Sequence, residues 1–257
     1  MKKKIFASLA VAAAFVISTG LAHADVVDFE VPVTANNSLA PFAPLITHTD
    51  EFYQGNFYVY TFSNVAGAAQ GVDLVGALVN GSDLSTCFSV TCPTNNASTF
   101  YTSLNDGVLA LGRVDNQSFS VNSFDASFLG GSDIGSLPAV SGLLRLQGFT
   151  AAGASLTQTY QLAGPSNGAL SFASYATTGS FATTQFQVVY AFGFACDTAG
   201  SCSAFSTNRG QFALDNIQLT SVTAVPEPET WALMLFGLVG VGALSRRQRA
   251  AANTTKE

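Results

Sequence analysis

The chain offers few side chains whose type and spacing would support catalysis. His48 is the one histidine between residues 25 and 224, so a serine or cysteine nucleophile there has a single candidate base. The Gly-x-Ser-x-Gly spacing occurs at Gly164-Pro165-Ser166-Asn167-Gly168, but this stretch is a cluster of turn residues and does not predict a nucleophile elbow. No His-x-x-x-His zinc pair occurs. Two carboxylates suffice to hydrolyse a glycosidic bond, but nothing in the sequence selects one pair of acids. We therefore expect a protein that is not an enzyme, with a two-carboxylate glycoside hydrolase as an alternative.

Four cysteines form two close pairs, Cys87 with Cys92 and Cys196 with Cys202. An even number of cysteines at short spacing, in a chain with export signals at its ends, predicts two local disulfides that each close a small loop. A metal site would need histidine or carboxylate ligands at suitable spacing, and free thiols are the other alternative.

Segment 52–60 carries five aromatic residues among polar ones. A sugar ring could stack on Tyr53, Tyr58 or Tyr60 while neighbouring amide side chains bond its hydroxyls. Aromatic residues at strand spacing are more often core residues and cross-strand pairs, so ordinary sheet packing is the alternative for this segment.

The apolar residues of segment 209–219 change parity halfway along it. They stand at even positions and then at odd ones: Phe212 and Leu214, followed by Ile217 and Leu219. A β-bulge at Asp215-Asn216 would turn both halves toward one core. Asp215 would then point inward, where a carboxylate needs a cation or several donors. An ion pair with Arg209, or backbone N–H groups at the bulge, would also satisfy it.

Other segments show the period-two alternation of strands. Segment 185–192 places Phe186, Val188, Tyr190 and Phe192 on one face, the pattern of a half-buried strand. Similar patterns mark the segments at 57–62, 144–148 and 156–162, and clusters of Gly, Ser, Asn, Asp and Pro separate them. No helical period is sustained between residues 25 and 224. The predicted fold is all-β, an antiparallel β-sandwich of jelly-roll type.

The charge of the segment between residues 25 and 224 is strongly negative. It contains thirteen Asp and Glu against three Arg and no Lys, a net charge of −10. Such a surface repels nucleic acid and anionic lipid, so we expect neither as a partner. It is compatible with bound Ca²⁺ or with neutral glycans.

Both ends of the chain carry export signals. A basic start, an apolar run to Leu21 and the small-residue site formed by Ala22 and Ala24 predict a signal peptide over residues 1–24, cleaved before Asp25. Residues 231–244 are fourteen residues without a charge, and as a helix they would cover only about 21 Å, short of the roughly 30 Å hydrocarbon core. The basic cluster that follows stays cytoplasmic by the positive-inside rule: Arg246, Arg247 and Arg249.

The C-terminal stretch resembles the PEP-CTERM sorting signal of exported proteins in Gram-negative bacteria that make exopolysaccharide. The match covers residues 225–249, with the Pro226-Glu227-Pro228 tripeptide, the short apolar helix and the arginine cluster in order. The resemblance implies that an exosortase recognises the tripeptide, cleaves near it and passes the domain to the cell surface or matrix. A plain single-pass tail anchor is the alternative.

Two further resemblances concern residues 25–224. Gln211-Phe212-x-x-Asp215 resembles the QFxxD signature of one group of PEP-CTERM proteins. The first and last predicted strands also look like those of jelly-roll carbohydrate-binding modules, in which acidic groups on these strands hold a structural Ca²⁺. By position, this resemblance nominates Asp28, Glu30 and Asp215 as oxygen ligands.

The sequence thus predicts four parts: a signal peptide (1–24), a β-sandwich domain (25–224), a sorting signal (225–249) and a cytoplasmic tail (250–257). The expected partners are the Sec export machinery, an exosortase and extracellular polysaccharide, with a transient inner-membrane stage through residues 231–244 and the domain in the periplasm. We expect a non-catalytic, carbohydrate-binding-like protein of the cell surface or extracellular matrix. A purely structural or adhesive matrix protein is the alternative.

Overall fold

The structure, a computed structural model, describes residues 22–30, 33–34, 45–87 and 90–222, and the isolated residues 235, 236 and 239. Residues 22–222 form one compact unit. Residues 1–21 of the signal peptide predicted over 1–24 lie outside the described residues, as does the sorting signal predicted over 225–249, apart from those three positions. Within the described part of the chain, no helix has both the length and the apolar character needed to cross a bilayer.

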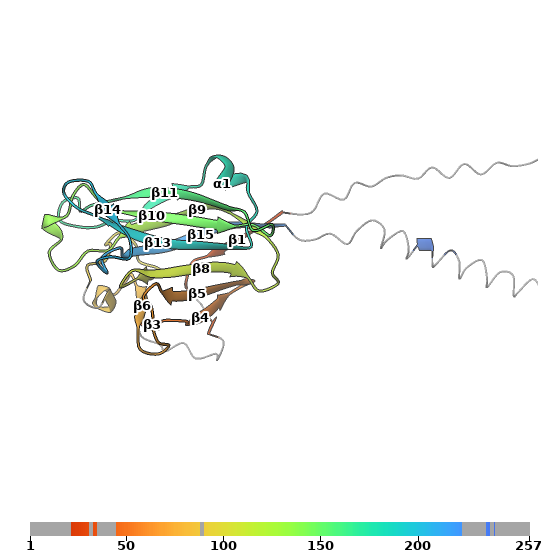
Figure 1. Cartoon of the computed structure of the whole chain (residues 1–257), viewed down its shortest axis with the longest axis horizontal. Coiled ribbons are helices and arrows are strands. Elements are labelled where there is room, and N and C mark those ends of the chain that lie inside the picture. Colours follow the sequence, from red (N-terminus) through yellow and green to blue (C-terminus); the bar gives the residue numbers. More distant parts are fainter. Residues whose placement is uncertain are drawn as a thin grey trace, which may run out of the picture. The chain divides into compact units, whose positions relative to one another are not determined.

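Two antiparallel sheets make up the unit (Figure 1). The first sheet contains, in spatial order, β12 (Ala173–Ala176), β9 (Phe119–Phe128), β15 (Phe212–Val222), β7 (Thr99–Ser103), β6 (Leu74–Asn80) and β3 (Leu45–Thr47), with β1 (Ala22–Val27) also paired to β15. The second sheet contains β11 (Ser155–Ala163), β10 (Val140–Phe149), β13 (Val188–Cys196), β8 (Gly107–Arg113), β5 (Phe57–Ser63), β4 (Glu51–Gln54) and β2 (Val33–Thr34), with β14 (Cys202–Ser203) paired to β13. The described helices are short: α1 (Gly179–Thr183) and the 3-10 turns η1 (Leu84–Cys87) and η2 (Ile134–Ser136). The predicted antiparallel β-sandwich is confirmed.

The main core lies between the two sheets and follows the alternation of the strands. In β5, Phe57 and Val59 are buried, whereas the intervening Tyr58 is partly exposed. Leu144 and Leu146 of β10 are buried on the predicted face. Alternate side chains of a strand point to opposite sides of its sheet, so one side of each strand fills the core and the other faces outward.

Strand β13 faces the core with its small side chains. Val189 and Ala191 are buried, whereas Tyr190 and Phe192 are partly exposed on the outer side of the sheet. The predicted strand is therefore present, but its aromatic face points outward. Phe186 precedes the strand and is fully buried, bridged to Phe119.

A second, smaller apolar cluster covers the other side of the seven-stranded sheet. The Cys87–Cys92 disulfide lies in it with Phe100, Leu129 and Ala213, all buried. The other predicted disulfide, Cys196–Cys202, closes the turn between β13 and β14. Both predicted cysteine pairs are confirmed.

Strand β15 contains the predicted bulge. Its register against β9 shifts after Asp215, and Asn216 adopts a left-handed φ of 50°. The apolar residues on both sides of the shift are buried in the same core: Phe212, Leu214, Ile217 and Leu219. The bulge is what lets a strand with a phase change contribute one continuous face.

Strand β1 begins upstream of the predicted signal-peptide cleavage site. Ala22 pairs with Val222 and Ala24 with Thr220, so the first three strand residues belong to the predicted signal peptide. Cleavage before Asp25 stays a prediction, and it would leave residues 25–27 paired with β15.

Candidate functional site

The outer side of the eight-stranded sheet carries a band of partly exposed aromatic side chains, which we call the aromatic face. Its members come from β5, β13 and β10: Tyr58, Tyr60, Phe62, Tyr190, Phe192, Phe194 and Phe149. The band crosses strand β8, whose outward residues are small. Tyr58 and Tyr60 of β5 lie opposite Gly112 and Ala110 of β8, and Tyr190 lies opposite Ala110 from the other side.

Ring contacts join four side chains of the aromatic face across β5, β13 and β10. The Phe62 ring lies 6.0 Å from that of Tyr60 and 5.8 Å from that of Tyr190, centroid to centroid. Tyr190 in turn lies 5.3 Å from Phe149 of β10. These separations are those of interacting aromatic pairs, so the rings brace one another and keep their orientations without being buried.

The three tyrosines nominated from the sequence lie on this side of the sheet. Tyr53 of β4 is paired directly across from Tyr58, and Glu51 directly across from Tyr60. Burial, with Glu51 and Tyr190 adding smaller effects, raises the pKa of Tyr58, so its hydroxyl stays protonated at neutral pH. The phenylalanines and Tyr190 were missed as part of the same surface, because the alternation of their strands does not say which side meets the second sheet.

Asp215 points inward at the bulge and is fully buried. Its Oδ2 accepts hydrogen bonds from Asn96 Nδ2 (2.6 Å) and Ser98 Oγ (2.7 Å), and its Oδ1 accepts one from the Asn216 backbone N–H (2.8 Å). Burial raises the pKa of this carboxyl, against the lowering effect of the three donors. The sequence predicted that a cation, Arg209 or backbone N–H groups would compensate the buried carboxylate. In the structure, two side-chain donors and one backbone N–H do so.

The other nominated calcium ligands have protein donors too. Asp28 Oδ1 accepts from the side-chain amide of Gln54, and Glu30 Oε1 accepts from the Thr99 backbone N–H (2.9 Å). Glu30 and Asp215 therefore contact neighbouring residues, Thr99 and Ser98, at the start of β7. Across the part of the chain that the structure describes, no three His, Cys, Asp or Glu side chains converge as they would around a metal ion. The calcium site stays a prediction.

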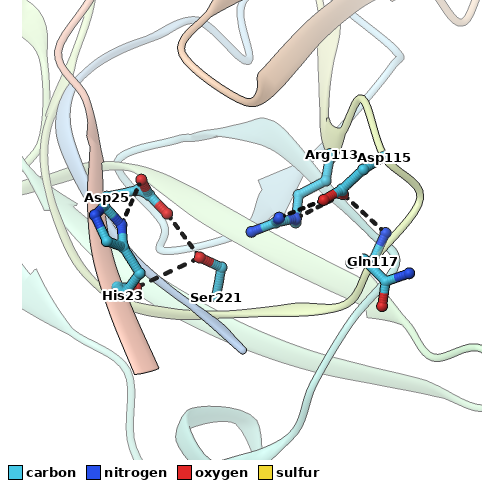
Figure 2. Close-up of polar contacts among 6 residues, drawn as sticks. All are labelled: His23, Asp25, Arg113, Asp115, Gln117 and Ser221. Atoms are coloured by element: carbon cyan, nitrogen blue, oxygen red, sulfur yellow. Dashed lines mark hydrogen bonds and ion pairs between the residues drawn. The ribbon is translucent and has the colours of Figure 1, made fainter. Parts of the chain in front are cut away.

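A serine, a histidine and an aspartate meet where β1 pairs with β15 (Figure 2). Ser221 Oγ donates to Asp25 Oδ2 (2.8 Å), and His23 Nδ1 lies 3.0 Å from Asp25 Oδ1. The aspartate lies between the other two, so the serine hydroxyl has no bond to the imidazole that would take its proton. This contact joins two strands and does not form a nucleophile–base pair.

Figure 2 also shows a buried arginine held by an exposed loop. Arg113 Nε and Nη2 donate to the two carboxylate oxygens of Asp115 at 2.8 and 2.5 Å, and the guanidinium lies 5.7 Å from the centre of the Phe57 ring. The Arg113 side chain holds the pKa of Asp115 at about 2. This pair fixes the turn after β8 and gives Arg113 a structural role.

The sorting segment is matched by a known family. Residues 224–249 match the PEP-CTERM protein-sorting motif, which confirms the resemblance seen in the sequence. The match begins two residues after the end of β15, so the sandwich leads directly into the motif. No curated protein matches the chain. Membership of the QFxxD group stays a prediction.

Solved structures with similar folds are distant. A DUF4465 family protein from Bacteroides ovatus is 8% identical with a TM-score of 0.37, covering 79% of this chain and 100% of that one. The C-terminal family 22 carbohydrate binding module of Clostridium thermocellum Xyn10B is 12% identical with a TM-score of 0.30, covering 64% of this chain and 92% of that one. The enzymatically active domain of tailspike protein 4 from bacteriophage CBA120 is 11% identical with a TM-score of 0.29, covering 65% of this chain, and the chain spans only 19% of its length. Likenesses this weak carry no argument about function.

Proposed function

We propose that the protein is a non-catalytic, jelly-roll-like β-sandwich that is exported, processed by an exosortase and bound to extracellular polysaccharide through its aromatic face. The sorting motif at residues 224–249 supports the first part of this proposal. In it, the chain passes through the inner membrane by residues 231–244, with the sandwich in the periplasm, and reaches the cell surface or matrix after cleavage near Pro226-Glu227-Pro228.

The observation that carries the binding proposal is the exposure of the aromatic face. A run of rings across three strands, partly open to solvent, is unusual on a protein surface and marks an interaction site. Flat rings accept the C–H face of a sugar, and polar side chains beside them can bond its hydroxyls. Glu51 lies directly opposite Tyr60, and Gln147 of β10 lies directly opposite Tyr190. The strong negative charge favours a neutral polysaccharide.

The test is retention on the exopolysaccharide of the producing bacterium. The full-length chain, purified in a detergent without a sugar headgroup, is compared with the double variant Tyr60→Ala/Tyr190→Ala. Ser180→Ala serves as the control, because Ser180 is an exposed polar residue of α1, outside the eight-stranded sheet. We expect retention to be lost in the double variant and kept in the control. If the wild-type chain is not retained, a structural or adhesive matrix protein without a sugar site becomes the better account.

A structural Ca²⁺ bound by Asp28, Glu30 and Asp215 belongs to this proposal. An ion that binds the native state alone raises stability by about 2.7 kcal/mol at a hundred times its dissociation constant. We expect calcium to raise the unfolding midpoint relative to a chelator, and Asp28→Asn to abolish that rise. Equal midpoints with calcium and with chelator would remove the site.

A further inference from the structure

A second candidate site lies at one end of the sandwich, away from the aromatic face. It is a cleft of about 720 Å³ between the loop 129–137, the hairpin 195–203 and the segment 207–211, which we call the distal cleft. Its volume falls in the range of roughly 300–1,000 Å³ that is usual for small-ligand sites. Its floor is apolar, with Phe128 and Leu137, and its rim is polar.

The distal cleft lies at the end of the sandwich opposite to the end that leads to the sorting motif. Arg209 and Gln211 precede β15, whereas the chain leaves that strand at Val222. At a rise of about 3.3 Å per residue, the ends of this strand are about 33 Å apart. Figure 1 shows β14, a wall of the cleft, at the opposite end of the unit from the start of β1. The cleft and the end of β15 at Val222 therefore lie at opposite ends of the sandwich.

The walls of the distal cleft are held in place by covalent and polar contacts. The Cys196–Cys202 disulfide closes the hairpin, and Asp197 Oδ1 accepts hydrogen bonds from the Ala199 and Ser201 backbone N–H groups. Preorganised walls reduce the entropy that a ligand loses on binding.

Arg209 supplies an unused cation at the rim. Arg113 is bound to Asp115, and Arg145 lies 4.7 Å from the centre of the Phe194 ring. Arg209 is exposed, and no carboxylate of the described residues lies within ion-pair distance of it. Its guanidinium can therefore donate to a ligand without first breaking a bond in the protein.

The mixture of groups at the rim selects the chemical class of the ligand. Arg209 only donates hydrogen bonds, Asp133 and Asp197 only accept them, and Gln211 does both. The two aspartates repel an anionic ligand, and the arginine repels a cationic one. An uncharged ligand that carries many hydroxyl groups satisfies donors and acceptors alike, and the carbon face of a sugar ring suits the apolar floor. We propose that the distal cleft binds a neutral saccharide, at a site separate from the aromatic face.

The experiment measures binding of neutral cello-, xylo- and galacto-oligosaccharides of three to six residues by calorimetry. It uses the full-length chain in a detergent without a sugar headgroup, with oligogalacturonate as the anionic comparison. Arg209→Gln removes the guanidinium, and Ser132→Trp fills the cleft from an exposed position without a side-chain hydrogen bond among the described residues. Ser180→Trp is the matched control, because Ser180 is an exposed serine of α1, remote from the cleft.

We expect a neutral oligosaccharide to bind the wild-type chain and the Ser180→Trp control equally. Ser132→Trp should abolish that binding, and Arg209→Gln should weaken it at least tenfold. The inference is overturned if no neutral oligosaccharide binds, if only oligogalacturonate binds, or if both cleft variants bind as the wild type does. Loss of binding in Tyr60→Ala/Tyr190→Ala alone would support the aromatic face and remove the distal cleft, so the two proposals fail separately.

Discussion

The Gly210 backbone N–H donates a hydrogen bond of 2.6 Å to Asp106 Oδ1. The other oxygen of the same carboxylate accepts a bond of 3.0 Å from the Asn208 backbone N–H, and the Asp106 side chain is buried. Residues 106 and 210 are far apart in the sequence, so one carboxylate ties the turn between β7 and β8 to the segment that enters β15. That segment contains Arg209, and its position depends on this contact.

Replacing this carboxylate by an amide should destabilise the protein. In Asp106→Asn the amide nitrogen would face a backbone N–H, because both oxygens now accept from main-chain donors. A buried donor left without an acceptor costs about 1–3 kcal/mol, and we expect a loss of that size in chemical unfolding. Asp133→Asn is the control, because its exposed side chain has no hydrogen bond within the described residues and should change stability by less than about 0.5 kcal/mol. Equal effects of the two variants would show that the Asp106 contact does not hold the segment.

The Arg113–Asp115 pair should make stability fall in acid. The pKa of Asp115 is lowered to about 2 in the folded protein, so its contribution is complete above its unfolded pKa of about 4 and is lost as pH falls toward 2. Asp115→Asn should cost ~1 kcal/mol at neutral pH, because half of the Asp115 side chain is exposed to screening solvent. The difference between variant and wild type should shrink below pH 4 in urea titrations. A difference that does not change with pH would contradict this assignment.

Asp215 should make stability fall as pH rises, which is the opposite of the effect of Asp115. Its folded pKa is raised, first by burial, so the native state holds a proton that the unfolded chain has already released. Stability should therefore decrease as pH rises from about 4 through the folded pKa of Asp215. In Asp215→Asn this decrease should disappear, although the loss of one acceptor should lower stability at low pH. Unfolding midpoints of wild type and variant, measured from pH 3 upward, give the two slopes; parallel curves would mean that Asp215 ionises as freely as in the unfolded chain.

Strand positions and the bulge were accessible from the sequence because they depend on local alternation. A strand whose apolar residues change parity at Asp215 can keep them all on one face if it contains one extra residue there, and the structure has such a bulge. The sequence did not show whether the aromatic residues of β13 face the core or the outer side of the sheet. Val189 and Ala191 alternate with Tyr190 and Phe192, so both sides of the strand are apolar and only the packing of the second sheet decides between them. The distal cleft was also hidden, because its walls come from three loops that the topology brings together.

The glycine beneath Tyr58 gives a way to move one ring of the aromatic face without deleting it. A Cβ atom at Gly112 of β8 would overlap the Tyr58 ring and hydroxyl, which lie directly over the glycine. The Tyr58 side chain is partly exposed, so it can swing outward, and Gly112→Ala should change stability by less than ~1 kcal/mol. Retention on exopolysaccharide should nevertheless fall, because the Tyr58 ring is displaced from its position over Gly112 on the aromatic face. Ser180→Ala is the control, because Ser180 is an exposed residue of α1, outside both proposed sites. Unchanged retention in Gly112→Ala would show that saccharide binding does not use the Tyr58 ring, and a stability loss above ~2 kcal/mol would show that the ring is fixed in place.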